Sequence, residues 1–395
     1  MSSSYTSVIS CLKLLVLIGL VSFFFSSCKE ENGGRGGDSS NPIEAAYFED
    51  YDSPTYKWGY IDVNGRKVLK AKWDALKEMQ DPLTAANYEG KWGYIDVDGK
   101  EKIPYKYKQA TRFQDQRAFV QDFYDKWLLL DVEGHVVDTT DYTQVNTFQD
   151  GHCVVEKFGL KGVINAEGKE ILPIEYNTVK IAGDKFIVSK NGLSGIVNKN
   201  EVVVPMEYDK IYMPNDGLFR FRKDRKYGYL DQSGKVVSPR LYDKANNFEG
   251  KYASVFYEGQ YHLINSRFQL IKSMSVDNLK SAGSGLWKYK QNNKWGLMDT
   301  KGMVLIKPRY ELVNKYSSGL IAVSNDDLWG YCDSEGKEVI PTRYPLAWDF
   351  YDGRARFIYD RGVGFIDKAG KIVIDDDFIE VRDFSNGKAR FQTYR

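Results

Sequence analysis

Residues that could do chemistry are scattered along this chain. Only three histidines occur, His135, His152 and His262, and no pair of them has the spacing of metal ligands. No serine lies in a nucleophile turn, and no glycine-rich loop precedes a helix to bind phosphate. Cys153 and Cys332 lack a partner histidine, and we interpret both as small buried hydrophobic residues. We therefore predict a protein that is not an enzyme, with no catalytic residues, no metal and no cofactor.

The one regular chemical feature is an Asp or Asn that returns ten times. These residues are Asp62, Asp96, Asp131, Asn165, Asn198, Asp231, Asn265, Asp299, Asp333 and Asp367. In eight copies a glycine follows three residues later, as Gly65 follows Asp62. A calcium loop needs several acids, whereas each copy supplies one. We interpret the pair as a hairpin turn, in which the carboxylate accepts a backbone N–H and glycine supplies a positive φ.

The turn belongs to a longer repeat. Lys57-Trp58-Gly59-Tyr60-Ile61-Asp62-Val63-Asn64-Gly65 returns as Lys91-Trp92-Gly93-Tyr94-Ile95-Asp96-Val97-Asp98-Gly99. The tryptophan position recurs every 33 to 35 residues through ten units. The motif is clearest at Trp58, Gly59, Asp62, Gly65, Trp92, Gly93, Asp96, Gly99, Trp295, Gly296, Asp299, Gly302, Trp329, Gly330, Asp333 and Gly336. A glycine beside the ring indicates that a neighbouring backbone or ring comes close.

The pattern within each unit predicts strands. Two apolar or aromatic residues follow the glycine position, and adjacent strand residues point to opposite faces, so this strand is buried on both sides. We predict an all-β chain of about ten units of ~34 residues, each with roughly three short strands. Propellers usually have four to eight blades of four strands. The expected architecture is therefore an open, curved β-solenoid or superhelix, and the alternative is a closed β-propeller-like ring.

The equivalent positions of the ten units, which we call columns, resemble those of the WG-repeat family of the KWG type, named for its tryptophan-glycine pair. The resemblance covers about residues 47–395, and we assign residues 45–395 to the repeat array. It implies an all-β repeat protein of a kind common in bacterial cell envelopes and on cell surfaces. It brings no established catalytic residues to this chain.

The N-terminal segment predicts a bacterial lipoprotein. Leu14 to Phe25 is an apolar run, and residues 1–27 have the organisation of a signal peptide. Phe25-Ser26-Ser27-Cys28 resembles a lipobox, although Phe25 departs from the usual leucine. Cys28 would be acylated with palmitate-type chains, and residues 28–44 would be the lipidated cysteine and a flexible linker. The alternative is an ordinary secretory signal. Lys29-Glu30-Glu31 resembles a tag for the outer face of the outer membrane, or is a solvated tether.

Charge and aromatic residues indicate the class of partner. Without Lys13 of the signal, 54 basic residues face 54 acidic ones, which argues against nucleic acid. Aromatic residues outside the strictest columns form the candidate binding surface: Trp287, Trp348, Tyr124, Tyr257, Tyr351 and Tyr359. The first hypothesis is a lipid-anchored, non-enzymatic scaffold for a protein partner at the cell outer membrane. The second is a glycan- or cell-wall-binding lipoprotein, and the third is a surface hydrolase.

Overall fold

The computed structural model describes residues 56–79, 82–199, 201–359 and 362–394. The predicted signal peptide, Cys28, the linker and positions 45–55 of the array lie outside the described residues. Every regular element in the described part is a β-strand, so the all-β prediction is confirmed. Accordingly, none of these residues belongs to a helix that could cross a membrane.

Ten small antiparallel sheets follow one another along the chain, and we number them I to X. Sheet I contains β38 (Glu380–Val381), β39 (Lys388–Tyr394), β1 (Tyr56–Asp62) and β2 (Lys67–Trp73). Sheet II contains β3 (Ala75–Leu76), β4 (Thr84–Tyr88), β5 (Lys91–Ile95) and β6 (Glu101–Tyr107). Sheet III contains β7 (Gln109–Ala110), β8 (Ala118–Gln121), β9 (Trp127–Leu130) and β10 (Val136–Thr140). Sheet IV contains β11 (Gln144–Val145), β12 (His152–Lys157), β13 (Leu160–Asn165) and β14 (Glu170–Tyr176). Sheet V contains β15 (Thr178–Ala182), β16 (Lys185–Lys190), β17 (Leu193–Val197) and β18 (Val202–Tyr208).

The second half continues the same order. Sheet VI contains β19 (Lys210–Ile211), β20 (Phe219–Lys223) and β21 (Lys226–Leu230). Sheet VII contains β22 (Lys244–Ala245), β23 (Tyr252–Tyr257), β24 (Gln260–Asn265) and β25 (Leu270–Met274). Sheet VIII contains β26 (Asn278–Gly283), β27 (Leu286–Gln291), β28 (Lys294–Met298) and β29 (Val304–Tyr310). Sheet IX contains β30 (Leu312–Ser317), β31 (Leu320–Asn325), β32 (Leu328–Cys332) and β33 (Glu338–Tyr344). Sheet X contains β34 (Leu346–Ala347), β35 (Ala355–Ile358), β36 (Val363–Ile366) and β37 (Ile372–Phe378).

Four strands per sheet, not three, is the usual number in the described part of the chain. The strand that the sequence pattern missed is the innermost one, which in sheets II, III and X spans only two residues. So short a strand has no period to detect. Sheet VI is the three-stranded exception, because its outer segment forms only the isolated bridges Leu230↔Val236 and Tyr227↔Tyr242.

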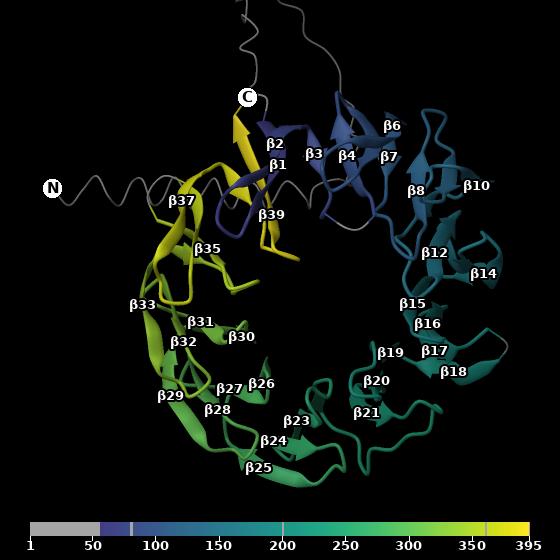
Figure 1. The fold of residues 1–395 in the computed structure, drawn as a ribbon. Helices are drawn as coiled ribbons and strands as arrows, with labels where there is room; N and C mark the ends of the chain where they lie inside the picture. The colour runs from purple at the N-terminus through teal and green to yellow at the C-terminus, as the bar shows by residue number, and fades with distance from the viewer. Residues whose placement is uncertain (1–55, 80–81, 200, 360–361, 395) are drawn as a thin grey trace, which may run out of the picture. The chain divides into compact units, whose positions relative to one another are not determined.

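The sheets close into a ring of ten (Figure 1). The first strand, β1, pairs with the last, β39, through seven residue pairs from Tyr56↔Tyr394 to Asp62↔Lys388. The open array expected from the sequence is therefore wrong, and the closed propeller-like ring, its alternative, is correct. Closure gives the first and last strands partners and leaves neither as the bare end of the array.

The motif residues have the structural roles that their chemistry indicates. Asp62 Oδ1 accepts the backbone N–H groups of Asn64 and Arg66, each at 2.9 Å, and Gly65 has a φ of +79°. The same bonds recur at Asp96, Asp299 and Asp333. A Cβ at Gly59, Gly93, Gly296 or Gly330 would lie 2.5 to 2.6 Å from a carbonyl oxygen of the outer strand. Glycine thus admits the neighbouring backbone where the strand register shifts.

Core packing between neighbouring sheets follows a rule of complementary size. Where the loop after the inner strand supplies a phenylalanine, the strand residue five positions later is small: Phe113 with Ala118, Phe148 with Cys153, Phe248 with Ala253, Phe350 with Ala355 and Phe384 with Ala389. Sheet VI has Pro214 in the loop and the large Phe219 on the strand. Sheets V and VIII replace the loop with a tight turn and place Phe186 and Trp287 on the strand. Each site receives one large side chain, as close packing requires.

The ring has two faces. Loops after the inner strands and the Asp-Gly turns lie on one, as the bonds from Arg117 Nε to the Ala166 carbonyl and from Arg354 Nε to the Val63 carbonyl indicate. Hairpins joining second and third strands lie on the other, because neighbouring strands in each sheet run in opposite directions. We call these the loop face and the hairpin face.

Candidate functional site

The larger cavity, of about 520 Å³, lies on the loop face where the ring closes. We call it the seam pocket. Its residues come from three consecutive sheets: Tyr351 and Arg356 from sheet X, Tyr60, Arg382, Asp383, Phe384, Ser385, Lys388 and Arg390 from sheet I, and Glu78 and Met79 from sheet II. Because these residues are separated by up to 330 positions in the sequence, from Tyr60 to Arg390, the pocket exists only in the closed ring.

The β39 strand positions the basic wall of the pocket. Lys388 and Arg390 alternate with the buried Ala389 and Phe391, so their side chains share the opposite face of the strand. Arg390 faces Tyr60 across the sheet, and its Nη1 donates to the Leu76 carbonyl at 2.6 Å. The Tyr60 hydroxyl donates to the Lys77 carbonyl. Sheets I and II are thereby joined at the pocket floor.

Burial sets the ionisation of this floor. It raises the pKa of the Tyr60 hydroxyl well above its ordinary value, so the phenol stays neutral at physiological pH. Burial likewise lowers the pKa of the Arg390 guanidinium, an effect that the nearby Tyr60 opposes. A guanidinium starts from so high a pKa that Arg390 remains a cation. The floor is therefore a fixed positive charge beside a neutral hydrogen-bond donor.

Ion pairs fix the two acids of the pocket. Arg356 Nε and Nη2 donate to the two carboxylate oxygens of Asp383 at 2.6 and 3.1 Å, and Arg356 Nη1 donates to the Val381 carbonyl at 3.2 Å. Glu78 accepts from Arg112 Nη1 at 2.8 Å. With both acids paired, four basic residues face two acidic ones in the lining. The pocket favours a ligand with a carboxylate or another anion.

Two of the sequence-predicted aromatic residues lie at this pocket. Tyr351 lines it, and 42% of its surface is exposed. Trp348 is half-buried beneath Arg356, whose guanidinium lies 4.4 Å from the ring centroid. The aromatic residues thus provide an apolar wall beside the cationic one.

The other four candidate binding residues lie away from the seam pocket. Trp287 is only 1% exposed and fills the core beside the tight turn of sheet VIII, so it is excluded from the binding surface. Tyr257 is half-buried and stacks on His262, with ring centroids 3.9 Å apart. Tyr124 and Tyr359 are exposed on the hairpin face, in sheets III and X. The six residues therefore do not form one surface.

Sequence reasoning missed the basic residues of the pocket. Arg356 and Arg390 occupy a strand position that holds Ala85, Phe119, Val154 or Ile187 in four other sheets, and is also basic in sheets VI and VIII, as Arg220 and Lys288. That difference between repeats was visible in the sequence. A basic residue in a strand column is the signal that points to these residues, whereas aromatic residues outside the columns do not.

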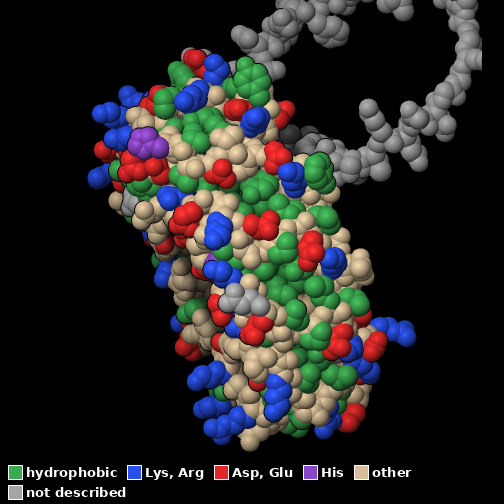
Figure 2. All heavy atoms as spheres, turned by 90° about the vertical axis from the view of Figure 1, so that its right-hand side faces the viewer, with side chains coloured by type: hydrophobic (Ala, Val, Ile, Leu, Met, Phe, Trp, Pro, Cys, Tyr) green, Lys and Arg blue, Asp and Glu red, His purple; other side chains and the backbone are tan. Residues whose placement is uncertain are grey.

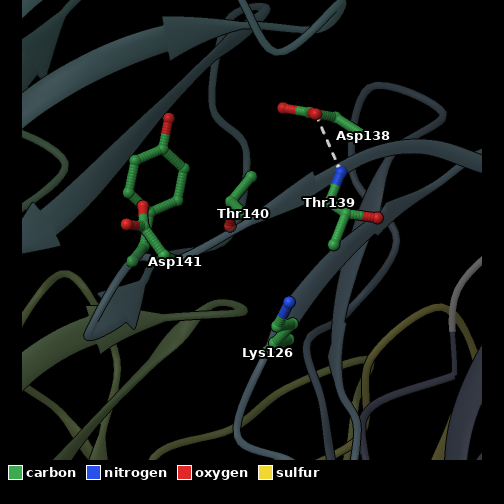
Figure 3. Close-up of a pocket in the computed structure, with 6 residues that line it drawn as sticks. Lys126, Asp138, Thr139, Thr140 and Asp141 are labelled. Carbon is green, nitrogen blue, oxygen red and sulfur yellow. Dashed lines mark hydrogen bonds between the residues drawn. The ribbon is translucent and has the colours of Figure 1, made fainter.

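A second, shallower cavity of about 300 Å³ lies beside sheet III (Figure 3). Its lining comprises Lys126, Asp138, Thr139, Thr140, Asp141 and Tyr142. Asp138 Oδ1 accepts the Thr139 backbone N–H at 2.8 Å, and Asp141 pairs with Lys157 at 2.6 Å. These bonds occupy the acids, so the cavity offers less to a ligand than the seam pocket does.

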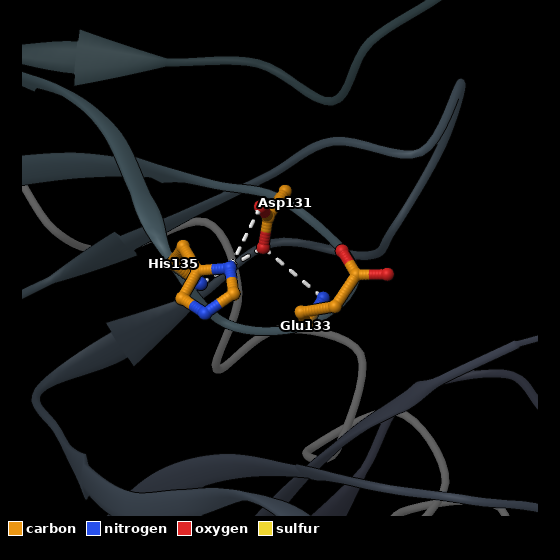
Figure 4. Close-up of side chains that lie close together, drawn as sticks. All are labelled: Asp131, Glu133 and His135. Atoms are coloured by element: carbon orange, nitrogen blue, oxygen red, sulfur yellow. Dashed lines mark hydrogen bonds and ion pairs between the residues drawn. The ribbon is translucent and has the colours of Figure 1, made fainter.

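Asp131, Glu133 and His135 also lie together (Figure 4). Asp131 Oδ1 accepts the backbone N–H groups of Glu133 and His135 at 3.1 and 2.8 Å, and Oδ2 lies 3.2 Å from His135 Nδ1. This is the hairpin turn found at Asp62 and its equivalents. The turn accounts for the position of the acid without a bound ion.

Sequence comparison agrees with this repeat structure. The family defined by the "WG containing repeat" matches residues 58–92, 92–127, 162–193, 198–227, 227–261, 295–329, 329–360 and 364–393. The chain belongs to the WG-repeat family. The two unmatched WG units begin at Trp127 and Tyr261, where Leu128 and His262 replace the motif glycine. No curated protein matches the chain.

Several solved structures are similar to parts of the WG-repeat ring. A eukaryotic initiation factor has a TM-score of 0.48 and 10% identity, over 80% of this chain and 98% of that one. BamB from Moraxella catarrhalis has a TM-score of 0.35 and 12% identity, over 73% and 99%. A computationally designed protein, Ika8, has a TM-score of 0.35 and 12% identity, over 66% and 93%. None of these similarities reaches a TM-score of 0.5, and no property of those proteins is transferred to this chain.

Proposed function

We propose that this chain is a non-enzymatic lipoprotein of the bacterial cell envelope, anchored at the outer membrane through acylated Cys28, whose ring binds a protein partner in the seam pocket. The anchor rests on the lipobox-like Phe25-Ser26-Ser27-Cys28. The partner site rests on the composition of the pocket. Arg, Tyr and Met are the residue types enriched where proteins bind one another, and the lining combines all three.

The charges of the pocket indicate what part of a partner it would hold. Arg382 is exposed and pairs with Glu380, and Lys388 is half-buried, whereas Arg356 and Arg390 are fixed by carbonyl oxygens. An acidic side chain or a C-terminal carboxylate would meet the basic wall, and an aromatic or aliphatic neighbour would meet Tyr351 and Met79. The proposed partner segment is therefore acidic and apolar together.

The alternatives fit this geometry less well. Glycan binding favours exposed rings in a row along one groove, but Tyr124, Tyr351 and Tyr359 lie on separate loops and on two faces. A glycoside hydrolase needs two available carboxyl groups, whereas Asp383 and Glu78 are both held in ion pairs.

Affinity capture from the native cell envelope, with the full acylated chain as bait, tests the proposal. Tyr351→Ala/Lys388→Ala removes two accessible pocket side chains, and Met213→Ala/Lys235→Ala makes matched changes on the loop face of sheet VI. We expect one envelope protein to be lost with the pocket variant and retained with the control. Capture that is identical for both variants, or recovery of chaperones alone, would contradict the proposal.

A further inference from the structure

On the hairpin face, exposed apolar side chains lie at or beside the hairpin turns along one arc of the ring, and we call these side chains the apolar tips. In sheet III, Phe123 is 58% exposed and Tyr124 is 88% exposed; in sheet IV, Phe158 is 84% exposed. Tyr359 in sheet X is 60% exposed, and Tyr88 in sheet II and Leu193 in sheet V are also exposed. These sheets are consecutive around the ring with sheet I among them, so the apolar tips form one continuous arc, the apolar arc.

Hairpin tips in the other sheets are polar, although Leu328 beside the tip of sheet IX is 36% exposed in the position of Leu193. Sheet VI has Asp224 and Arg225 at its tip, sheet VII has Glu258, sheet VIII has Asn292 and Asn293, and sheet IX has Asp326 and Asp327. Since the hairpins have equivalent positions in the repeat, folding makes the same demand on all of them. The tips of sheets II and V are Glu89-Gly90 and Asn191-Gly192, so the exposed aromatic tip residues Phe123, Tyr124 and Phe158 of sheets III and IV are the departure from the repeat.

Phe158 shows that folding alone does not select these aromatic residues. It has a φ of +52°, a conformation that asparagine, aspartate and glycine adopt more readily than a bulky residue does. Asn191, Asp224 and Asn292 occupy the equivalent place in other hairpins. An exposed phenylalanine there gains little core packing in return for its strain, which is typical of a functional site.

A longer loop presents the two tips of sheet III. Asp122 Oδ1 accepts the backbone N–H groups of Tyr124 and Lys126, each at 2.9 Å, and this turn places Phe123 and Tyr124 at its outer end. Figure 2 views the ring from the side of sheets II to V, where hydrophobic side chains form a band among charged ones.

The chain itself enters the ring on this face. Tyr56, the first described residue, begins β1 opposite Tyr394, at the end where other sheets have their hairpin. It follows Cys28 by 28 positions. A linker of that length, as predicted from the sequence, would have a root-mean-square reach of about 26–31 Å. Acyl chains on Cys28 would hold a bilayer within that distance of Tyr56, in sheet I, which is next to sheet X near one end of the apolar arc.

We propose that the apolar arc inserts its tips into the interface of the bilayer that holds Cys28, so that the loop face and the seam pocket point away from the membrane. Tyrosine rings suit the headgroup region, and phenylalanine and leucine suit the boundary with the acyl chains. Acidic Glu89, Asp122 and Asp125 accompany basic Lys91, Lys126 and Lys157 beside the tips. The interaction is therefore with zwitterionic as well as anionic lipid. It rests on the proposed acylation of Cys28.

Vesicle flotation separates docking from acylation. The Cys28→Ala chain without the predicted signal peptide, residues 1–27, is mixed with phosphatidylcholine vesicles, alone or with phosphatidylglycerol, and compared with the same chain carrying Phe123→Ser/Tyr124→Ser/Phe158→Ser. We expect partition onto both vesicle types and a loss of at least about tenfold in the triple variant, because three exposed apolar groups no longer leave water. Asp224→Ser/Asn292→Ser/Asp326→Ser on the opposite arc should change nothing.

An environment-sensitive fluorophore reports docking in the anchored protein. The fluorophore NBD is attached at Tyr124→Cys or, as the control, at Asn292→Cys, and the acylated chain is placed in phosphatidylcholine vesicles. We expect a blue shift at position 124 only. Equal emission at both positions, together with equal flotation of the triple variant and its parent, would overturn docking even where radiolabelled palmitate shows acylated Cys28. Flotation that depends on the three apolar residues, together with no palmitate incorporation by the chain that retains Cys28, would instead support docking and refute the anchor.

Discussion

Exchanging two core residues of sheet X tests the rule of complementary size. Phe350 is 1% exposed and packs edge-on against Tyr331, with ring centroids 4.8 Å apart. Truncation of such a ring costs about 3–5 kcal/mol of unfolding free energy. Ala355, in the same core cluster, is fully buried, so Ala355→Phe with Phe350 retained overfills the site and costs about 3 kcal/mol.

The double variant Phe350→Ala/Ala355→Phe should be much more stable than the sum of its parts. Its side chains then resemble sheet VI, where Pro214 stands in the loop and Phe219 on the strand. Independent costs would sum to about 6–8 kcal/mol, whereas we expect a loss of about 1–2 kcal/mol, because one ring again fills one site. Neighbouring residues that share a cavity are the ones expected to couple in this way.

Urea unfolding followed by tryptophan fluorescence measures these free energies, provided each variant unfolds in a single transition with the same urea dependence. Phe350→Ala combined with Ala118→Phe in sheet III is the matched control, in which Phe113 is retained and no rescue is expected. Additive losses in the sheet X double variant, equal to those of the control pair, would refute complementary packing as the reason for the observed residue pairs.

Two further predictions concern ionisable groups. Burial raises the pKa of the Cys153 and Cys332 thiols to about 12, so maleimide should modify neither at pH 7 until urea unfolds the ring; fast labelling of the native protein would contradict this. Burial also raises the pKa of Asp349, and the hydrogen bond that Asn314 donates to its carboxylate opposes this shift. The folded state therefore binds the proton of Asp349 more tightly than the unfolded state does, and the protein gains stability as pH falls. Asp349→Asn should therefore stabilise the protein at pH 7, and this gain should vanish below pH 3.8, the ordinary pKa of aspartate. Urea unfolding at a series of pH values measures the gain. A gain that persists below pH 3.8 would show that burial of the charged carboxylate is not its cause.

The sequence predicted the local structure because local residues determine it. Asp62 and Gly65 form the same turn in any stacking of repeats, and the apolar pair after Gly59 requires burial on both sides in a ring as in a solenoid. The inner strands were missed because two residues such as Gln109–Ala110 show no period. The pairs of Phe350 with Ala355 and of Pro214 with Phe219 were readable, since both members lie five positions apart.

Closure could not be predicted in the same way. It depends on pairing between Tyr56–Asp62 and Lys388–Tyr394, and both segments have the ordinary strand pattern of their repeats. Only the curvature of the stacked repeats decides whether these two segments meet. The seam pocket shares this limit, because Tyr60 and Arg390 come together through that pairing alone. Tyr351 was predicted as a binding residue, and the structure adds the basic residues around it.

A pair of engineered cysteines tests closure most directly. Lys57 and Thr393 face each other across β1 and β39, and Lys226 occupies the place of Lys57 in sheet VI. In the full chain, Lys57→Cys/Thr393→Cys should oxidise to a disulfide that shifts mobility on a non-reducing gel, and Lys226→Cys/Thr393→Cys should not. Absence of the first disulfide, while the adjacent control pair Tyr88→Cys/Lys91→Cys still oxidises, would contradict the closed ring and with it the seam pocket.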